Sequence, residues 1–293
     1  MNVKSWGCIL FAGVLALAVP GVSGAKEAGA PSEARVVAPD PVFQIKGWVH
    51  QFRVGDVAGL AQAMIPPAKW EEVRSAYDIK RQKPIEDAER THFAEQLERF
   101  TAPDAVEVLM AEIEPELVDA RAQWPGMLML GMGAAQMAVA SPDVDLSPEQ
   151  RDALKRMLPG LQQWAATTDF LDAATLRQAF TLLADAVRRT DIRDLDMLRQ
   201  LPLEAALDRA GPLLLAGKDA LRLYGLDLDA VVDSLQVDVL ANDGRSARVR
   251  TRVTVFGAAI SGEHELVLIE GRWYDASALK VHVASDLAMA AGH

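Results

Sequence analysis

The chain has 293 residues, of which 50% are hydrophobic and 24% charged, a composition typical of a globular protein that buries a sizeable core. Its formal net charge of −11 argues against non-specific binding to nucleic acid or to anionic membrane surfaces, because both need a basic field. The length predicts one or two domains.

Residues 1–25 have the pattern of a secretory signal peptide. Lys4 gives a positive start, an apolar run covers Cys8 to Val19, and Ser23-Gly24-Ala25 offers small residues for cleavage. The alternative is a membrane anchor, but the run is shorter than the roughly 20 residues that a spanning helix needs. We therefore expect a periplasmic or secreted protein with no stable membrane span after signal cleavage.

Cys8 is the only cysteine of the chain and lies inside the predicted signal peptide. The mature chain is thus expected to form no disulfide and to hold no thiolate metal site, so its stability must come from core packing. Residues 26–41 are rich in Ala, Pro and Glu without periodicity, which predicts a flexible linker.

Residues 42–225 are expected to be helical, because apolar side chains recur at steps of three and four. Pro202 and Pro212 are each expected to start a new helix, and Gly225 to end the last one before the sheet. Clear inward stripes are Val106, Leu109, Ile113 and Leu117, then Leu154, Leu158, Leu161 and Ala165, then Leu176, Phe180, Leu183 and Val187.

The stretch Gly126 to Ala140 carries four methionines, several small residues and no charge. One interpretation is a central helix buried on all sides, which the uniform apolar character favours. The other is a surface that grips a ligand or lies on a membrane, since methionine adapts to varied apolar shapes. We expect the buried helix.

Side chains alternate between apolar and polar from Leu235 onward, which predicts an antiparallel meander of about four strands. Asn242-Asp243-Gly244 is expected to form a three-residue hairpin loop, with Gly244 left-handed. This loop would pair Val237 with Val249, Val239 with Ala247, and Asp238 with Arg248. Further turns are expected at Gly257 to Gly262 and at Glu270-Gly271.

The fourth strand is expected to begin at Arg272, with Trp273 and Tyr274 pointing to opposite faces, one inward and one outward. The predicted fold class is α+β, a mostly helical N-terminal and middle region followed by the meander. The predicted organisation is a signal peptide (1–25), a linker (26–41), a helical region (42–225), a sheet packed on the last helices (226–283) and a tail (284–293).

The final third resembles NTF2-like (cystatin-like) domains of exported bacterial proteins. The resemblance is carried by Ala247, Val249, Val253 and Val255 in one strand, by Gly271-Arg272-Trp273-Tyr274, and by Gly55-Asp56 with Leu60. It covers about a quarter of the chain, and the long helical middle departs from it. It implies a curved sheet folded over helices, with a cavity. Such domains include enzymes and binding proteins alike, so the resemblance fixes no function.

No catalytic or metal-binding motif stands out. The five histidines are scattered, and His264-Glu265 lacks the second histidine of the zinc-protease helix. There is no Gly-x-Ser-x-Gly elbow and no glycine-rich phosphate loop. We therefore predict no metal site, no cofactor and no catalytic residue.

Arg248, Arg250 and Arg252 alternate on the outer face of the second strand, with Asp238 opposite. One interpretation is an anion-binding strip, because guanidinium groups grip carboxylates in a bidentate fashion. The other, which the acidic composition favours, is a solvated face paired with acidic neighbours. With His264, these residues are the predicted binding site.

The function predicted from these patterns is non-catalytic binding of an envelope protein partner or an apolar small molecule. The alternative is a small-molecule enzyme with an acid/base residue, such as His264 or Asp238, in a sheet-lined pocket. A structural component of the envelope is a third class.

Overall fold

The computed structural model describes residues 39–144 and 148–276. The predicted signal peptide with Cys8, nearly all of the predicted linker and the predicted tail lie outside the described residues. The helices are α2 (Pro41–Val54), α3 (Val57–Met64), α4 (Pro67–Arg81), α5 (Asp87–Thr101), α6 (Ala105–Ala140), α7 (Pro148–Thr167), α8 (Ala173–Arg189), α9 (Leu195–Gln200), α10 (Leu203–Leu223) and α11 (Leu228–Asp233). The strands are β1 (Gln236–Asn242), β2 (Ser246–Val255), β3 (Ala258–Ile269) and β4 (Arg272–Asp275).

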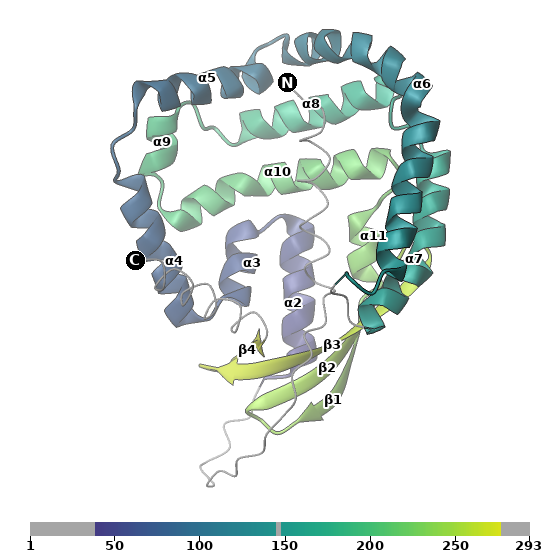
Figure 1. Ribbon diagram of the computed structural model, residues 1–293. Helices are drawn as coiled ribbons and strands as arrows, with labels where there is room; N and C mark the ends of the chain where they lie inside the picture. Colours follow the sequence, from purple (N-terminus) through teal and green to yellow (C-terminus); the bar gives the residue numbers. More distant parts are fainter. Residues whose placement is uncertain (1–38, 145–147, 277–293) are drawn as a thin grey trace. The chain divides into compact units, whose positions relative to one another are not determined.

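The α+β fold class is confirmed: in the described part of the chain, ten helices precede one antiparallel sheet with the strand order β1-β2-β3-β4 (Figure 1). The chain divides into two compact units. Among the described residues, one unit comprises 39–45, 133–144, 148–163 and 234–276, and the other comprises Lys46–Met132 and Trp164–Asp233. The boundaries fall within α2, α6 and α7.

In the helical unit, α10 is the common neighbour of α3, α4, α8 and α11. Gly211 on α10 meets Gly55, where a Cβ on Gly211 would lie 2.6 Å from the Gly55 carbonyl oxygen. Gly55 itself has a φ of +75°, which favours glycine. This glycine pair lets the chain between α2 and α3 approach α10 at backbone distance.

The apolar stripe predicted for the residues of α6 contributes to a core cluster. Val106 and Met110 on α6 pack with Ala184 on α8, and the neighbouring partly buried side chains are Ile113, Ala173, Leu176 and Phe180. The inward stripes predicted for these two helices are therefore confirmed at Val106, Ile113, Leu176 and Phe180.

Prolines do not all begin helices. Pro202 is the N-cap of α10, as expected, but Pro212 lies inside α10, so the predicted helix start there is wrong. Pro115 and Pro125 likewise lie inside α6, and Pro159 inside α7. Gly225, with a φ of +80°, ends α10, although the short helix α11 still precedes the sheet.

The predicted hairpin register between the first two strands is wrong. Val237 pairs with Thr251, Asp238 with Arg250, and Val239 with Val249, and the pairing shifts again between Val239 and Ala241. The loop is longer than expected because the Asp243 carboxylate accepts hydrogen bonds from the backbone N–H groups of Arg245 (2.8 Å) and Ser246 (2.6 Å). Gly244 is left-handed, as predicted, with a φ of +85°.

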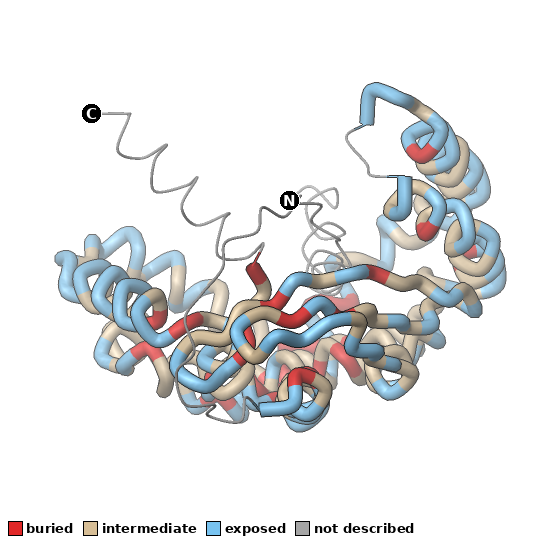
Figure 2. The backbone as a smooth tube through the Cα atoms, turned by 90° about the horizontal axis from the view of Figure 1, so that it is seen from below, coloured by how far each residue is buried: buried red, intermediate tan, exposed pale blue. Residues whose placement is uncertain are grey.

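Before the irregularity between Val239 and Ala241, the predicted and observed registers differ by two residues. Side chains two apart share a face, so each side chain still lies on its predicted face of the sheet. Ala247 and Val249 are buried, while Arg248 and Arg252 are exposed. Figure 2 shows buried and exposed positions following one another along the strands. The second turn is shorter than the predicted turn at Gly257 to Gly262. Phe256 and Gly257, with φ values of 48° and 76°, form it, and β3 already begins at Ala258. The turn at Glu270-Gly271 is confirmed.

Trp273 and Tyr274 are both buried, with 0% and 1% of their surface exposed, so the expectation that one points outward into solvent is wrong. The start of α2 lies against the free edge of β4. The Gln44 side-chain amide accepts a hydrogen bond from the Trp273 backbone N–H (2.8 Å) and donates one to its carbonyl (2.5 Å). The Trp273 indole N–H donates to the Pro39 carbonyl (2.6 Å).

Candidate functional site

The three arginines predicted as an anion-binding strip lie on one face of β2 and face acidic neighbours. Arg250 forms an ion pair with Glu263 on β3, at 2.6 Å. Arg248 is opposite Glu265 in the register. One guanidinium group is therefore already paired with a carboxylate, and a second has a glutamate as its cross-strand neighbour.

The remaining members of the strip also have partners. Arg252 donates to the Gln236 side-chain oxygen at 3.1 Å. Asp238 is opposite Arg250, not Arg248 as the sequence suggested. The arrangement matches a solvated face of interleaved charges, each exposed pair contributing little to stability.

His264 belongs to the opposite face of the sheet. Its register partner is Val249, which is fully buried, whereas the arginines alternate with Val249 along β2. The five predicted site residues are therefore not brought together, because His264 is separated from the other four by the thickness of the sheet.

His264 instead joins two residues that the sequence did not single out. Its Nδ1 lies 3.2 Å from Asp275 Oδ2 on β4, and its Nε2 lies 3.1 Å from Thr251 Oγ1 on β2. The signal that could have found them is the two-residue turn at Phe256-Gly257. Once that turn is placed, Thr251 pairs with Gly262, two residues from His264.

α6 exposes several large apolar side chains, most of them in residues 122–140, which carry no charge. The exposed fraction is 71% for Val118, 78% for Met129, 76% for Leu130 and 74% for Met137. The expectation that Gly126 to Ala140 is buried on all sides is therefore wrong, although this stretch is helical. The less exposed residues Trp124, Leu128, Met132, Ala135 and Val139 recur every three or four positions. Only one stripe of the helix is thus turned inward.

A shallow, open depression of about 380 Å³ lies at the ends of α7 and α10 and the start of α8. It is lined by Thr168, Asp169, Asp172, Thr175, Leu223, Tyr224 and Gly225. Burial, and then the Asp172 and Asp169 carboxylates, raise the pKa of Tyr224. The carboxylate of Asp172 accepts hydrogen bonds from the Thr175 N–H (2.8 Å) and hydroxyl (2.7 Å), which lowers the pKa of Asp172. It therefore caps α8.

Aromatic rings pack beside this depression. Phe170 stacks on Tyr224, with ring centroids 5.6 Å apart, and meets Trp164 edge-on at 4.9 Å and Trp124 at 5.4 Å. The Trp164 indole N–H donates to the Tyr224 carbonyl at 2.6 Å. These contacts fix the α7–α8 connection against the end of α10.

Lys218 on α10 has only 3% of its side chain exposed and holds the end of α2. Its ammonium group donates to the Arg53 carbonyl (2.9 Å) and the Phe52 carbonyl (3.4 Å), and forms an ion pair with Asp229 at 2.5 Å. Three acceptors match the three N–H donors of an ammonium group. Lys218 is thus satisfied as a structural cation.

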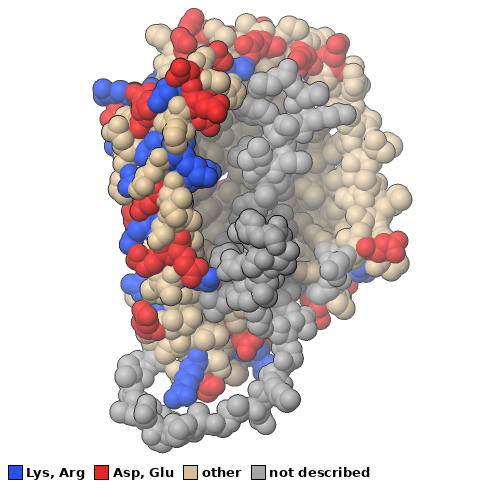
Figure 3. Space-filling view, turned by 60° about the vertical axis from the view of Figure 1, so that its left-hand side comes forward, with Lys and Arg blue, Asp and Glu red and all other residues tan. Residues whose placement is uncertain are grey.

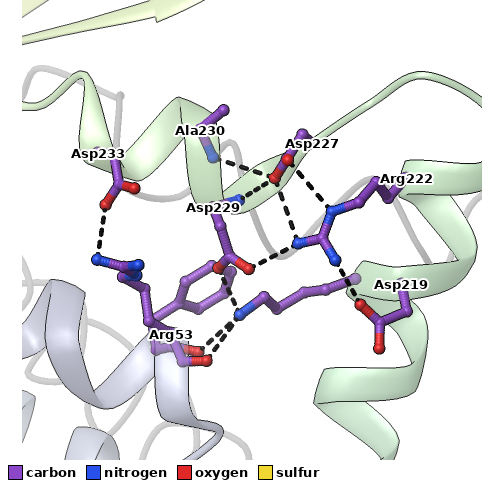
Figure 4. Close-up of polar contacts among 9 residues, drawn as sticks. Arg53, Asp219, Arg222, Asp227, Asp229, Ala230 and Asp233 are labelled. Atoms are coloured by element: carbon purple, nitrogen blue, oxygen red, sulfur yellow. Dashed lines mark hydrogen bonds and ion pairs between the residues drawn. The ribbon is translucent and has the colours of Figure 1, made fainter.

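The charges around Lys218 extend to Arg222, whose guanidinium group reaches Asp219, Asp227 and Asp229, while Arg53 reaches Asp233 (Figure 4). Asp227 also accepts from the N–H groups of Asp229 and Ala230 at the start of α11. The Ala230 N–H first, and Arg222 next, lower the pKa of Asp227. The network fastens α11 to α10.

Among the described residues, no three histidine, cysteine, aspartate or glutamate side chains gather in a way that could hold a metal ion. Within residues 39–144 and 148–276, no helix is both long and apolar enough to cross a bilayer.

Comparison with known proteins gives no match: no family model, no curated protein and no solved structure is similar to the chain at a significant level.

Proposed function

We propose that this chain is an exported binding protein that uses the uncharged surface of residues 122–140 of α6 to bind an envelope protein partner. The observation that carries the proposal is the exposure of Met129 and Leu130, 78% and 76%, in a stretch without charge. Soluble proteins rarely expose contiguous apolar surface unless something binds there.

The chemistry of the surface fits a protein partner. Methionine is flexible and polarisable, so Met127 and Met129 adapt to the shape of an apolar partner surface. The chain has no charged residue between Arg121 and Asp143. Figure 3 shows side chains of both charges interspersed over α4 and α5, and a largely tan surface along the second half of α6. A partner that covers this part of α6 therefore desolvates no charge.

Export is supported by the signal-peptide pattern of residues 1–25. Cell fractionation tests it: the mature chain is expected in the periplasm or the medium, with an N-terminus near Lys26. A full-length chain in the cytoplasm would contradict export.

The binding surface is tested by placing a photo-crosslinking amino acid at Met129 in intact cells and identifying the products by mass spectrometry. We expect a reproducible protein adduct. The variant Met129→Glu/Leu130→Glu should lose this partner, because a buried carboxylate without a counter-charge costs several kcal/mol.

The matched control is Ile79→Glu, which places a carboxylate on another exposed apolar residue, 66% exposed on α4. This variant should keep the partner. Equal loss in both variants, or crosslinks from Met129 to lipid alone, would rule out the proposed protein-binding surface on α6. A small apolar ligand that co-purifies with the wild type and not with the double variant would replace the protein partner.

A further inference from the structure

Three polar side chains from three neighbouring strands form a continuous chain on one face of the sheet. Asp275 on β4 contacts His264 on β3 (Oδ2 to Nδ1, 3.2 Å), and His264 contacts Thr251 on β2 (Nε2 to Oγ1, 3.1 Å). Carboxylate, imidazole and hydroxyl thus stand in the order that activates a hydroxyl nucleophile in many unrelated folds.

The partners of the ring define where its proton lies. Because an ionised carboxylate only accepts hydrogen bonds, the tautomer that fits these contacts has its hydrogen on His264 Nδ1, directed at Asp275. Nε2 then has a lone pair directed at the Thr251 hydroxyl. The other acceptor near this hydroxyl, the Gly262 carbonyl, is more distant at 3.4 Å. In this tautomer, Nε2 is therefore the nearer acceptor for the Thr251 proton.

The surroundings hold these groups in place without sealing them off. The side chain of His264 is 14% exposed and that of Asp275 is 29% exposed. The neighbours on the same face, Val249 and Leu266, are buried and pack against the strands. Thr251 is β-branched, which restricts its first side-chain torsion and keeps the hydroxyl near the ring.

We propose that Thr251 is a nucleophile for carboxylic esters with a good leaving group, with His264 as its general base and Asp275 as the positioning residue. Thr251 Oγ1 bonds to the carbonyl carbon while its proton moves to His264 Nε2. The carbon–oxygen bond to the leaving alcohol then breaks, and the alcohol takes that proton. Water attacks the threonyl ester, restoring the hydroxyl and releasing the acid, so ester and water yield acid and alcohol.

This site shares no residue with the α6 surface, so the proposal stands apart from the proposed binding function. The probe is p-nitrophenyl acetate, because a good leaving group reduces the need for oxyanion stabilisation. The expected result is release of p-nitrophenolate with an acetyl group on Thr251, located by peptide mass spectrometry of the folded full chain.

The variants separate catalysis from structure. Thr251→Val should abolish the adduct, and Thr251→Ser should keep it. His264→Gln should slow acylation about 100-fold or more, the scale of general-base catalysis. Asp275→Ala should slow it as well, and Asp275→Glu should restore part of the rate. The matched control is Thr254→Val, since Thr254 is exposed on the same strand and lies opposite Ala259.

The decisive measurement is made on the wild type and needs no variant to fold. If p-nitrophenyl acetate acetylates only lysines and leaves Thr251 unmodified, the proposal is overturned. Equal acylation of Thr251 in folded His264→Gln would also overturn it. The three residues would then be a polar ladder that only ties the strands together.

Discussion

Gly160 on α7 touches the turn between β2 and β3. A Cβ at this position would lie 1.9 Å from the Phe256 carbonyl oxygen, far inside van der Waals contact. A backbone oxygen cannot swing away as the end of a side chain can. The helix and the turn therefore approach each other only because residue 160 lacks a side chain.

Gly160→Ala should therefore destabilise the protein by about 2 kcal/mol, the usual scale for overpacking, even though alanine favours helices. Urea unfolding monitored by circular dichroism measures this. The control is Gly217→Ala on α10, where a Cβ meets nothing within 4 Å. That change should be neutral or stabilising by up to about 1 kcal/mol. Equal stability of the Gly160→Ala protein would show that the turn moves freely.

Glu204 in the first turn of α10 is a second sensitive residue. It accepts hydrogen bonds from Arg74 Nη2 (2.6 Å) and Nε (2.9 Å) and from the Trp70 indole (3.2 Å). Its own backbone N–H first, and Arg74 next, hold the pKa of Glu204 below its ordinary value. The folded state thus favours the ionised carboxylate. The resulting stability is fully present above the unfolded-state pKa and is lost as the pH falls through the lower folded-state pKa.

Glu204→Gln is expected to lower the unfolding midpoint by about 2 °C at pH 7, with the difference shrinking below about pH 4. Thermal unfolding between pH 3 and pH 7 tests this. Glu71→Gln removes the more exposed partner of the same arginine, 64% exposed, and should change the midpoint little. A difference that stays constant with pH would exclude the charge as its cause.

At the scale of elements, the two edges of the sheet are protected differently. An unpaired strand edge invites pairing with other chains, and natural proteins block such edges. On β1 the pairing shifts between Val239 and Ala241, which interrupts a flat edge. On β4 the Gln44 side chain satisfies both the N–H and the carbonyl of Trp273. The Gln44 amide thus makes the two backbone hydrogen bonds that a residue of a neighbouring fifth strand would make.

Gln44→Ala should leave both backbone groups of Trp273 without this partner and destabilise the sheet by about 1–3 kcal/mol. Hydrogen exchange at the Trp273 amide is the direct readout, and its protection should fall. Gln44→Glu keeps the acceptor and loses the donor, so it should retain protection of that amide better than alanine. Unchanged exchange in the alanine variant would mean that other groups seal the edge.

The strands were predictable as a set because period-two alternation is local information. Their register was not, since it depends on turn geometry. Asp243 closes a longer loop through its side chain, and Phe256 adopts a left-handed φ that phenylalanine rarely shows. The side-chain contacts of His264 with Thr251 and Asp275 depend on that register, so the sequence did not predict them. His264 alone was recognised.

At the scale of the whole molecule, composition predicted the α+β class but not which apolar residues are inside. Gly126 to Ala140 was expected to be core because it has no charge, yet Met129 and Leu130 are mostly exposed. Charge-free helices are buried or bound to something else, and sequence alone does not distinguish the two cases. Pro212 shows a related limit, since a proline in a helix removes one hydrogen bond without ending the helix when packing compensates.

The clasp between Gln44 and Trp273 joins positions 229 residues apart. Gln44 is synthesised 229 residues before Trp273, so β4 cannot be secured until the chain has been made up to that point. Loop-closure entropy makes such a distant contact a late step in folding. Until this contact forms, the outer edge of β4 stays open to pairing with strands of other chains.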